Sequence, residues 1–227
     1  MNKKDNLEHA IVLGGGGSLA IGWESGYLLT LSNQGIDVRH ADLMIGTSGG
    51  AQAATGLTSD KSFDVIYDEQ IAPKSNEMPP VKDMSGIFER YAQIQEHSNS
   101  PKEWIENYSI YALEDHKFNE SVHITRLEHR IKGTEWPSNL MITAINARKS
   151  ERVALTSDSQ VNLHRAMASS GSLPGVWPAT KSDGGKHFDG GCHSMEDADL
   201  AKGAKKVLIF ATNLPVSTPY KLEDAIK

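Results

Sequence analysis

The 227-residue sequence has few of the features that mark secreted, disulfide-rich or membrane-spanning proteins. It contains a single cysteine, Cys192, which excludes an internal disulfide framework and a multi-cysteine metal site. The apolar run near its N-terminus, Ala10–Leu13, is shorter than the core of a signal peptide, which needs about 7–15 residues. No run approaches the about 20 apolar residues of a membrane span. These absences predict a cytoplasmic protein, although export without a cleaved signal is compatible with them.

Positive charge is also scarce. The chain has 29 Asp and Glu against 23 Lys and Arg, which gives a net charge of −6 at pH 7. This balance argues against a nucleic-acid partner and against broad attraction to anionic lipid surfaces. The length suits one large domain and is too short for two, so we expect a single domain over residues 1–227.

Strand-like and helix-like segments alternate along the chain, which predicts an α/β fold, a three-layer α/β/α sandwich with a mainly parallel central sheet. The expected strands are Ala10–Leu13, Ala41–Thr47, Leu140–Ala147, Arg152–Thr156, Lys186–Phe188 and Lys205–Asn213. The expected helices are Trp23–Leu31, Ala51–Thr55 and Val161–Ser170. Between about residues 58 and 137 the pattern weakens, and we interpret this range as a cap-like insertion over the end of the sheet where α/β proteins place their sites.

The stretch Gly46-Thr47-Ser48-Gly49-Gly50 fits G-x-S-x-G, the nucleophile elbow. A serine on a tight strand-to-helix turn has strained backbone angles, and small residues two positions before and after it avoid collisions. The apolar strand before and the small-residue helix after supply the required context. The pattern therefore favours Ser48 as a nucleophile, flanked by Gly46 and Gly50, over a purely structural glycine-rich turn.

Four glycines, Gly14 to Gly17, follow the first expected strand and precede a helix. Their amides can face inward as an oxyanion hole or anion cradle, or the glycines can simply form a tight turn. A nucleotide site is disfavoured because the dinucleotide and Walker glycine patterns are both absent. With an elbow some thirty residues later, the oxyanion role is favoured, with Gly15, Gly16, Gly17 and the Gly49 amide as donors.

The histidines and the aromatic residues give weaker signals. None of the nine histidines has a context that demands catalysis, and Glu120-x-x-His123 is only half of a carboxylate metal motif. We expect no metal and no organic cofactor. Trp104, Tyr108 and Tyr111 recur at helical spacing, which favours the buried face of a helix over an interfacial helix that dips into lipid.

The tripeptide Asp-Gly-Gly occurs twice, at Asp183 and at Asp189. Asp183 lies between two strand-like segments, where Asp-Gly is a hairpin turn signal. The glycine-rich loop, the elbow, the second Asp-Gly-Gly and "ASSGSLPGVWPA" (Ala168–Ala179) together resemble the bacterial patatin-like phospholipases from Ala10 to about Asn213.

The resemblance implies a serine acyl hydrolase with a Ser–Asp dyad and no catalytic histidine, in which Ser48 is the nucleophile and Asp189 its base. It also implies a lipid or small ester substrate, with a phospholipid or lysophospholipid favoured. Transient contact with a membrane surface is compatible with such a substrate, and the sequence leaves it open. The oligomeric state is left open by the sequence.

Two departures from the family bear on this prediction. The family carries an Arg or Lys after its first glycines, whereas no Lys or Arg occurs here between Lys4 and Arg39. Charge in the transition state then rests on backbone amides or on a group from elsewhere, and a lipid-binding or regulatory protein with weak or no turnover is the main alternative. An acyltransferase or thioesterase would use the same nucleophile. The segment Leu214–Lys227 is also short for the family, so a truncated C-terminus is expected.

Overall fold

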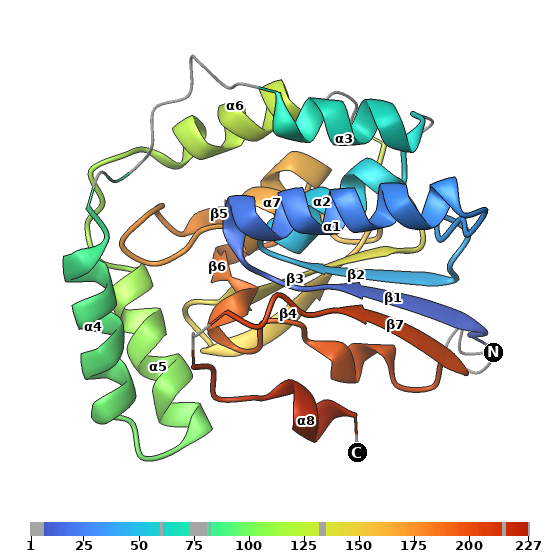
Figure 1. The fold of residues 1–227 in the computed structure, drawn as a ribbon. Helices are drawn as coiled ribbons and strands as arrows, with labels where there is room; N and C mark the ends of the chain where they lie inside the picture. Colours follow the sequence, from blue (N-terminus) through green and yellow to red (C-terminus); the bar gives the residue numbers. More distant parts are fainter. Residues whose placement is uncertain are drawn as a thin grey trace.

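The computed structural model describes residues 7–59, 61–72, 81, 83–131, 135–214 and 217–226. Within them a seven-stranded sheet forms the centre of the fold (Figure 1), in the order β5-β6-β3-β2-β1-β7 with β4 paired to β3. The strands are β1 (His9–Leu13), β2 (Leu43–Thr47), β3 (Leu140–Asn146), β4 (Glu151–Leu155), β5 (Thr180–Ser182), β6 (Gly185–Asp189) and β7 (Lys206–Phe210). The predicted α/β class is confirmed.

The central strands are parallel because helices separate them in the sequence and cover the sheet. β7, β1, β2 and β3 run parallel, whereas β4, β5 and β6 join through antiparallel pairs. β1 and β2 are almost wholly buried, as expected of short apolar runs covered on both faces.

Helices flank both faces of the sheet (Figure 1). One face carries α1 (Gly17–Asn33), α2 (Gly49–Leu57) and α7 (Leu163–Ser170), and the largest apolar cluster lies between these helices and the strands. The other face carries a thinner layer, the short 3₁₀ helix Ala198–Ala201 and α8 (Leu222–Ala225), packed on Ala10, Val12 and Ile45. No helix among the described residues has the length and apolar character needed to cross a bilayer.

The first helix begins earlier than its sequence pattern indicates. α1 starts at Gly17, six residues before the predicted Trp23. Two glycines in its first six residues, Gly17 and Gly22, lower helix propensity and hide the start. Burial of Ala20 and Ile21 in the folded chain compensates for this low propensity.

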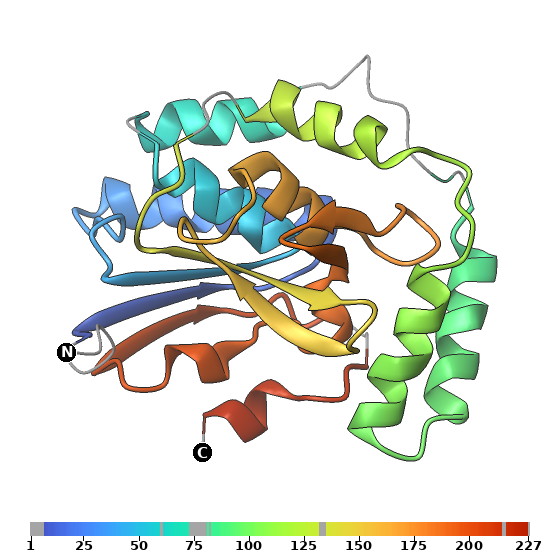
Figure 2. The same cartoon turned by 180° about the vertical axis from the view of Figure 1, so that it is seen from behind.

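The described residues between 58 and 137 form four helices, which lie in two places (Figures 1 and 2). α4 (Ser85–Glu96) and α5 (Pro101–Ala112) lie at the end of the sheet where β1 and β2 finish. α3 (Phe63–Ile71) and α6 (Glu120–Arg130) instead lie outside the helical layer, against α1 and α7. Residues 60, 73–80, 82 and 132–134 of this range lie outside the described part of the chain.

The aromatic stripe on α5 faces inward. Tyr108 is buried, Trp104 and Tyr111 are half-buried, and all three pack in a cluster with α4 and Phe188 of β6. The predicted buried helix face is therefore confirmed. Ser100 caps the helix by accepting a hydrogen bond from the Glu103 amide, and Pro101 occupies the first turn, where its missing N–H is not needed.

Candidate active site

Two strands meet end to end along one edge of β3. β2 pairs with the first half of β3, ending at Thr47 opposite Thr143. β6 runs in the opposite direction along the second half, ending at Asp189 opposite Ala144. Because Thr143 and Ala144 are consecutive, this register brings Ser48, just after β2, next to Asp189 at the end of β6.

Ser48 occupies a strained strand-to-helix turn. Its φ of 52° and ψ of −116° lie in a region that residues with a side chain rarely adopt. The turn places Ser48 at the N-terminus of α2, where the helix dipole favours a developing negative charge. The Ser48 amide donates to Oγ of Ser170 at 2.8 Å, which holds the turn against the end of α7.

The glycines around Ser48 permit the close approach of neighbouring backbone. A Cβ at Gly46 would lie 2.5 Å from Cα of Ala51, and one at Gly50 would lie 2.1 Å from the carbonyl oxygen of Leu13. Both distances are too short for any side chain. The elbow is therefore packed tightly against the end of β1.

Asp189 faces Ser48 from the end of β6. Oγ of Ser48 donates to Oδ2 of Asp189 at 2.8 Å, and the Gly191 amide donates to Oδ1 at 2.8 Å. Burial raises the pKa of Asp189 to about 7, against the lowering effect of these two hydrogen bonds. A carboxylate with a pKa near neutrality is suited to accept a proton at physiological pH and to return it.

Steric contact also requires a glycine at position 190, directly after Asp189. A Cβ at Gly190 would lie 2.4 Å from Oγ1 of Thr143 on β3. The chain can therefore turn sharply at the end of β6 only with glycine there, and this turn lets the Gly191 amide reach back to the carboxylate.

The first glycine loop lies against the elbow. A Cβ at Gly15 would be 3.6 Å from Cβ of Ser48, and one at Gly49 would be 2.6 Å from the carbonyl oxygen of Gly17. The Gly15 amide, however, donates to the carbonyl oxygen of Met195 at 2.7 Å, so it is engaged elsewhere. Within the described part of the chain, the amides of Gly16, Gly17 and Gly49 have no such acceptor and remain the candidate oxyanion donors.

A cavity of about 860 Å³ opens onto Ser48 and Asp189. Its lining combines the first glycine loop and the elbow with side chains of α4, α5, α6 and the segment after α7. Most of these side chains are apolar or aromatic, among them Met84, Phe88, Tyr91, Tyr108, Leu173, Val176, Trp177 and Leu214. Such a lining suits the hydrocarbon part of a ligand.

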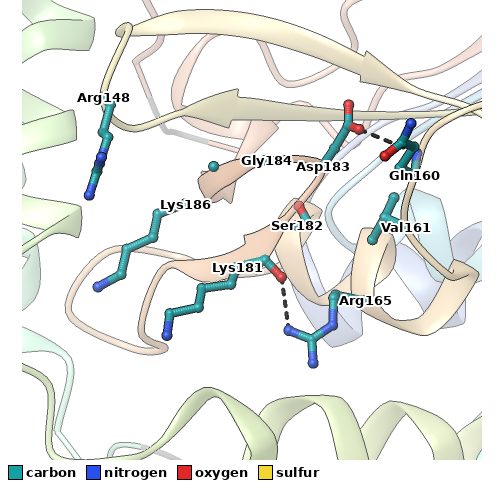
Figure 3. A pocket seen from close by; sticks show the side chains of 10 residues that line it. Arg148, Gln160, Val161, Arg165, Lys181, Ser182, Asp183, Gly184 and Lys186 are labelled. Carbon is teal, nitrogen blue, oxygen red and sulfur yellow. Dashed lines mark hydrogen bonds between the residues drawn. The ribbon is translucent and has the colours of Figure 1, made fainter.

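The other Asp-Gly-Gly lies in a separate place. Asp183 and Gly184, both with positive φ, form the two-residue turn between β5 and β6, as the sequence predicts. Asp183 borders a second cavity of about 440 Å³, where its Oδ1 accepts from the Gln160 amide at 3.3 Å (Figure 3). Four basic residues, Arg148, Arg165, Lys181 and Lys186, also line this cavity.

A buried serine–histidine pair near this turn is structural. The side-chain Oδ1 of Asn146 accepts from the backbone amides of Arg148 and Lys149, so the side-chain NH₂ group of Asn146 donates to Nε2 of His187. Nδ1 of His187 must then carry the proton and donate to Oγ of Ser182 at 2.9 Å. A histidine that donates to a hydroxyl cannot take that hydroxyl's proton, so this pair does not supply a second nucleophile.

Two further histidines make hydrogen bonds away from Ser48 and Asp189. His164 bonds the carbonyl oxygen of Ile131, and His193 bonds Asp197 at 2.7 Å and stacks on Tyr220. Among the residues that the structure describes, no group of three or more His, Cys, Asp or Glu side chains is placed to hold a metal ion.

A comparison with family models agrees with this geometry. The model described as patatin-like phospholipase matches residues 11–202, which include the glycine loop, the elbow and Asp189. The chain belongs to the patatin-like phospholipase family. Membership supports lipid acyl hydrolysis as the general class of activity.

Two solved structures are similar to this patatin-like chain at low identity. VipD from Legionella pneumophila is 14% identical, with a TM-score of 0.45, over 82% of this chain and 46% of VipD. The type III effector protein ExoU is 15% identical, with a TM-score of 0.41, over 74% of this chain and 40% of ExoU. The chain thus spans less than half the length of either protein, and no curated protein matches it.

Several residues of this patatin-like site carry no individual signal in the sequence. Ser170, which accepts from the Ser48 amide, lies in the segment "ASSGSLPGVWPA", so the family resemblance marks the segment but gives the residue no role. His123 and Arg126 of α6 line the cavity from the weakly patterned insertion. Only the packing of α6 against α7 brings them there.

Proposed function

We propose that this protein is a serine acyl hydrolase that cleaves carboxylic esters of lipids, with Ser48 as nucleophile and Asp189 as its base. The observation that carries the proposal is the 2.8 Å hydrogen bond from Oγ of Ser48 to Oδ2 of Asp189 inside a largely apolar cavity. A nucleophile bonded to a base of pKa about 7 is the arrangement that acyl transfer requires.

The first half-reaction follows from these contacts. Oγ of Ser48 attacks the ester carbonyl carbon while its proton passes to Oδ2 of Asp189. The carbonyl oxygen becomes an oxyanion, which the Gly16, Gly17 and Gly49 amides would stabilise. Collapse of this intermediate breaks the bond to the alcohol oxygen, which takes the proton from Asp189 and leaves an acyl-enzyme.

The second half-reaction repeats the same proton transfers with water. Asp189 takes a proton from a water molecule while the oxygen of that water attacks the acyl-enzyme carbonyl carbon. The second tetrahedral intermediate collapses to the free fatty acid, and Oγ of Ser48 regains its proton from Asp189. The Gly191 hydrogen bond to Oδ1 keeps the carboxyl oriented through both steps.

A fluorophosphonate probe tests the activated serine directly. We expect intact-mass spectrometry to detect one adduct on the wild-type protein and none on Ser48→Ala. Absence of an adduct on folded wild-type protein would contradict an activated Ser48.

Matched aspartate variants then test the assignment of roles. Asp189→Asn should lower kcat on a fatty-acyl ester by about 10²–10⁴-fold, the usual contribution of a general base. Asp183→Asn makes the same chemical change in the exposed turn and should retain activity. Equal losses in both variants, with folding preserved, would refute the roles given to the two tripeptides.

The alternatives give different results in the same experiments. A lipid-binding protein without turnover would bind lipid in both wild type and Ser48→Ala and release no fatty acid. An acyltransferase would form the Ser48 adduct but would pass the acyl group to an alcohol or another acceptor in place of water, and a thioesterase would take the acyl group from a thioester in place of an oxygen ester. Product analysis with and without an added alcohol acceptor, on an oxygen ester and on the thioester of the same acyl chain, separates these cases.

A further inference from the structure

The cavity beside the β5–β6 turn is lined mainly by cations, and we call it the basic cavity. It has a volume of about 440 Å³ and shares no described lining residue with the cavity of Ser48. Its lining includes one acidic residue, Asp183, and four basic ones, Arg148, Arg165, Lys181 and Lys186 (Figure 3). In a chain with a net charge of −6 this is a local reversal of charge, which attracts anions.

Two of these cations lie opposite each other in the hairpin. Lys181 of β5 pairs directly with Lys186 of β6, so both side chains project from the same face of the sheet. In Figure 3 the two side chains extend in the same direction. Like charges directly opposite each other destabilise an antiparallel pair. The hairpin is therefore under a repulsion that a bound anion would relieve.

The described part of the chain does not supply this anion. The Asp183 carboxyl accepts a hydrogen bond from the Gln160 amide and points away from the Lys181 and Lys186 ammonium groups (Figure 3). Among the residues that the structure describes, the side chains of Arg148, Lys181 and Lys186 make no hydrogen bond or ion pair. Three cations are thus available to a ligand.

The fourth cation, Arg165 of α7, has a structural part. Its Nη1 donates to Oε1 of Glu120 at 3.2 Å and to the carbonyl oxygen of Lys181 at 2.8 Å. Oε2 of Glu120, at the start of α6, accepts in turn from the Lys181 amide at 2.7 Å. These bonds tie β5 to α6 and α7, so the strand that carries Lys181 is held in place before any ligand binds.

We propose that the basic cavity binds a small soluble molecule that carries two or more phosphate groups. Arg148 offers a planar fork of N–H groups and the two lysines offer compact charges, and both kinds of group bind phosphate oxygens. Three cations exceed the charge of about −1.5 to −2 on one phosphate, so a second phosphate is needed to match them. The cavity volume lies within the range of small-ligand sites. An anionic bilayer fits less well, because the net negative charge of the chain opposes its approach.

This site is separate from the proposed hydrolase activity but is connected to it by β6. The strand begins beside the basic cavity and ends at Asp189. A ligand that bridges Lys181 and Lys186 therefore stabilises the hairpin that presents Asp189 to Ser48. Binding itself needs no turnover, so it can be measured on an inactive variant.

Calorimetric titration with inorganic tripolyphosphate tests the site. The proteins are wild type, Ser48→Ala, Lys181→Gln/Lys186→Gln and the control Lys202→Gln/Lys206→Gln. Lys202 and Lys206 are exposed, and Lys206 lies in β7 at the opposite edge of the sheet, so the control removes the same charge far from the basic cavity.

We expect one-to-one binding to wild type, to Ser48→Ala and to the control. The affinity of Lys181→Gln/Lys186→Gln should be about 10- to 100-fold lower, the usual effect of losing a hydrogen bond between charged groups. Absence of saturable binding to wild type, or equal losses in the two double variants, would overturn the proposal. Lysine-dependent binding to vesicles of phosphatidylcholine and phosphatidylserine, without binding of tripolyphosphate, would also overturn it and would identify a membrane as the partner.

Thermal unfolding gives a second readout, which a purely structural pair of lysines would not produce. Without ligand, Lys181→Gln removes the repulsion and should raise the melting temperature by about 1–3 °C. Tripolyphosphate should raise the melting temperature of wild type and of the control, but not that of Lys181→Gln/Lys186→Gln. A lower melting temperature of ligand-free Lys181→Gln, or an equal tripolyphosphate shift in all three proteins, would overturn the inference. Because Ser48→Ala should bind like wild type, these outcomes do not depend on whether the protein hydrolyses an ester.

Discussion

Replacing the buried aspartate of the dyad by its isosteric amide should make the protein more stable at alkaline pH while it removes activity. Asp189 is 3% exposed and, among the residues that the structure describes, accepts hydrogen bonds from Ser48 and Gly191 alone. Its ionised form is therefore poorly solvated, which is why burial raises the pKa to about 7. Asparagine keeps the shape and the acceptor for the Gly191 amide but can never be ionised.

The sign and size of the effect follow from proton binding. Between pH 3.8 and about 7 the folded state holds a proton on Asp189 that the unfolded chain has already released. The stability from this group is thus fully present below pH 3.8 and is lost as pH rises through 7. Because one pKa unit is worth about 1.36 kcal/mol, the total loss is about 4 kcal/mol, which Asp189→Asn avoids.

Urea unfolding followed by tryptophan fluorescence at several pH values between 5 and 8.5 measures this difference. The variant should exceed wild type only modestly at pH 5 and by up to about 4 kcal/mol at pH 8.5. Asp183→Asn removes the same charge from an exposed turn, so its free energy of unfolding should not rise relative to wild type as the pH increases. If Asp189→Asn differs from wild type by the same free energy at pH 5 and pH 8.5, or is less stable than wild type at pH 8.5, the reasoning from desolvation is refuted.

Three further predictions concern the same site. Because Asp189 must be ionised to accept the proton of Ser48, kcat/KM on a neutral ester should rise with pH through about 7, and a profile flat from pH 5 to 8 would contradict its role as base. Ser48→Gly should relieve the positive φ of 52° and raise thermal stability by about 1 kcal/mol while it abolishes the probe adduct; a loss of stability would contradict strain at the elbow. Gly50→Ala should destabilise the fold by about 3 kcal/mol or more in urea, since the new Cβ would lie 2.1 Å from the Leu13 carbonyl oxygen, and near-wild-type stability would show that the elbow can shift.

The sequence predicts the parts of this fold whose signals are local. Short apolar runs identify the buried strands β1, β2 and β3, because a strand covered on both faces needs continuous apolar residues. Asp-Gly identifies the β5–β6 turn, because both of its central residues have positive φ. The single-domain organisation, the truncated C-terminus and the cytoplasmic location stay predictions.

Features that depend on distant parts of the chain could not be predicted. The predicted start of α1, at Trp23, is wrong because tertiary burial overrides the low helix propensity of the glycines before it. The engagement of the Gly15 amide depends on Met195, 180 residues later in the sequence. Likewise, nothing in the local pattern around Arg126 shows that α6 packs beside α7 and faces the cavity of Ser48.

The two Asp-Gly-Gly tripeptides are connected by β6, a strand of five residues. β6 begins just after the turn at Asp183 and Gly184 and ends at Asp189, so the turn sets the register from which Asp189 is reached. Within that strand, the buried bonds of His187 to Ser182 and Asn146 tie β6 to β5 and to β3. A shift of β6 by one residue would turn each of its side chains to the opposite face of the sheet and move the carboxyl away from Ser48. The first tripeptide therefore contributes to the site without chemistry of its own, by fixing where the second one ends.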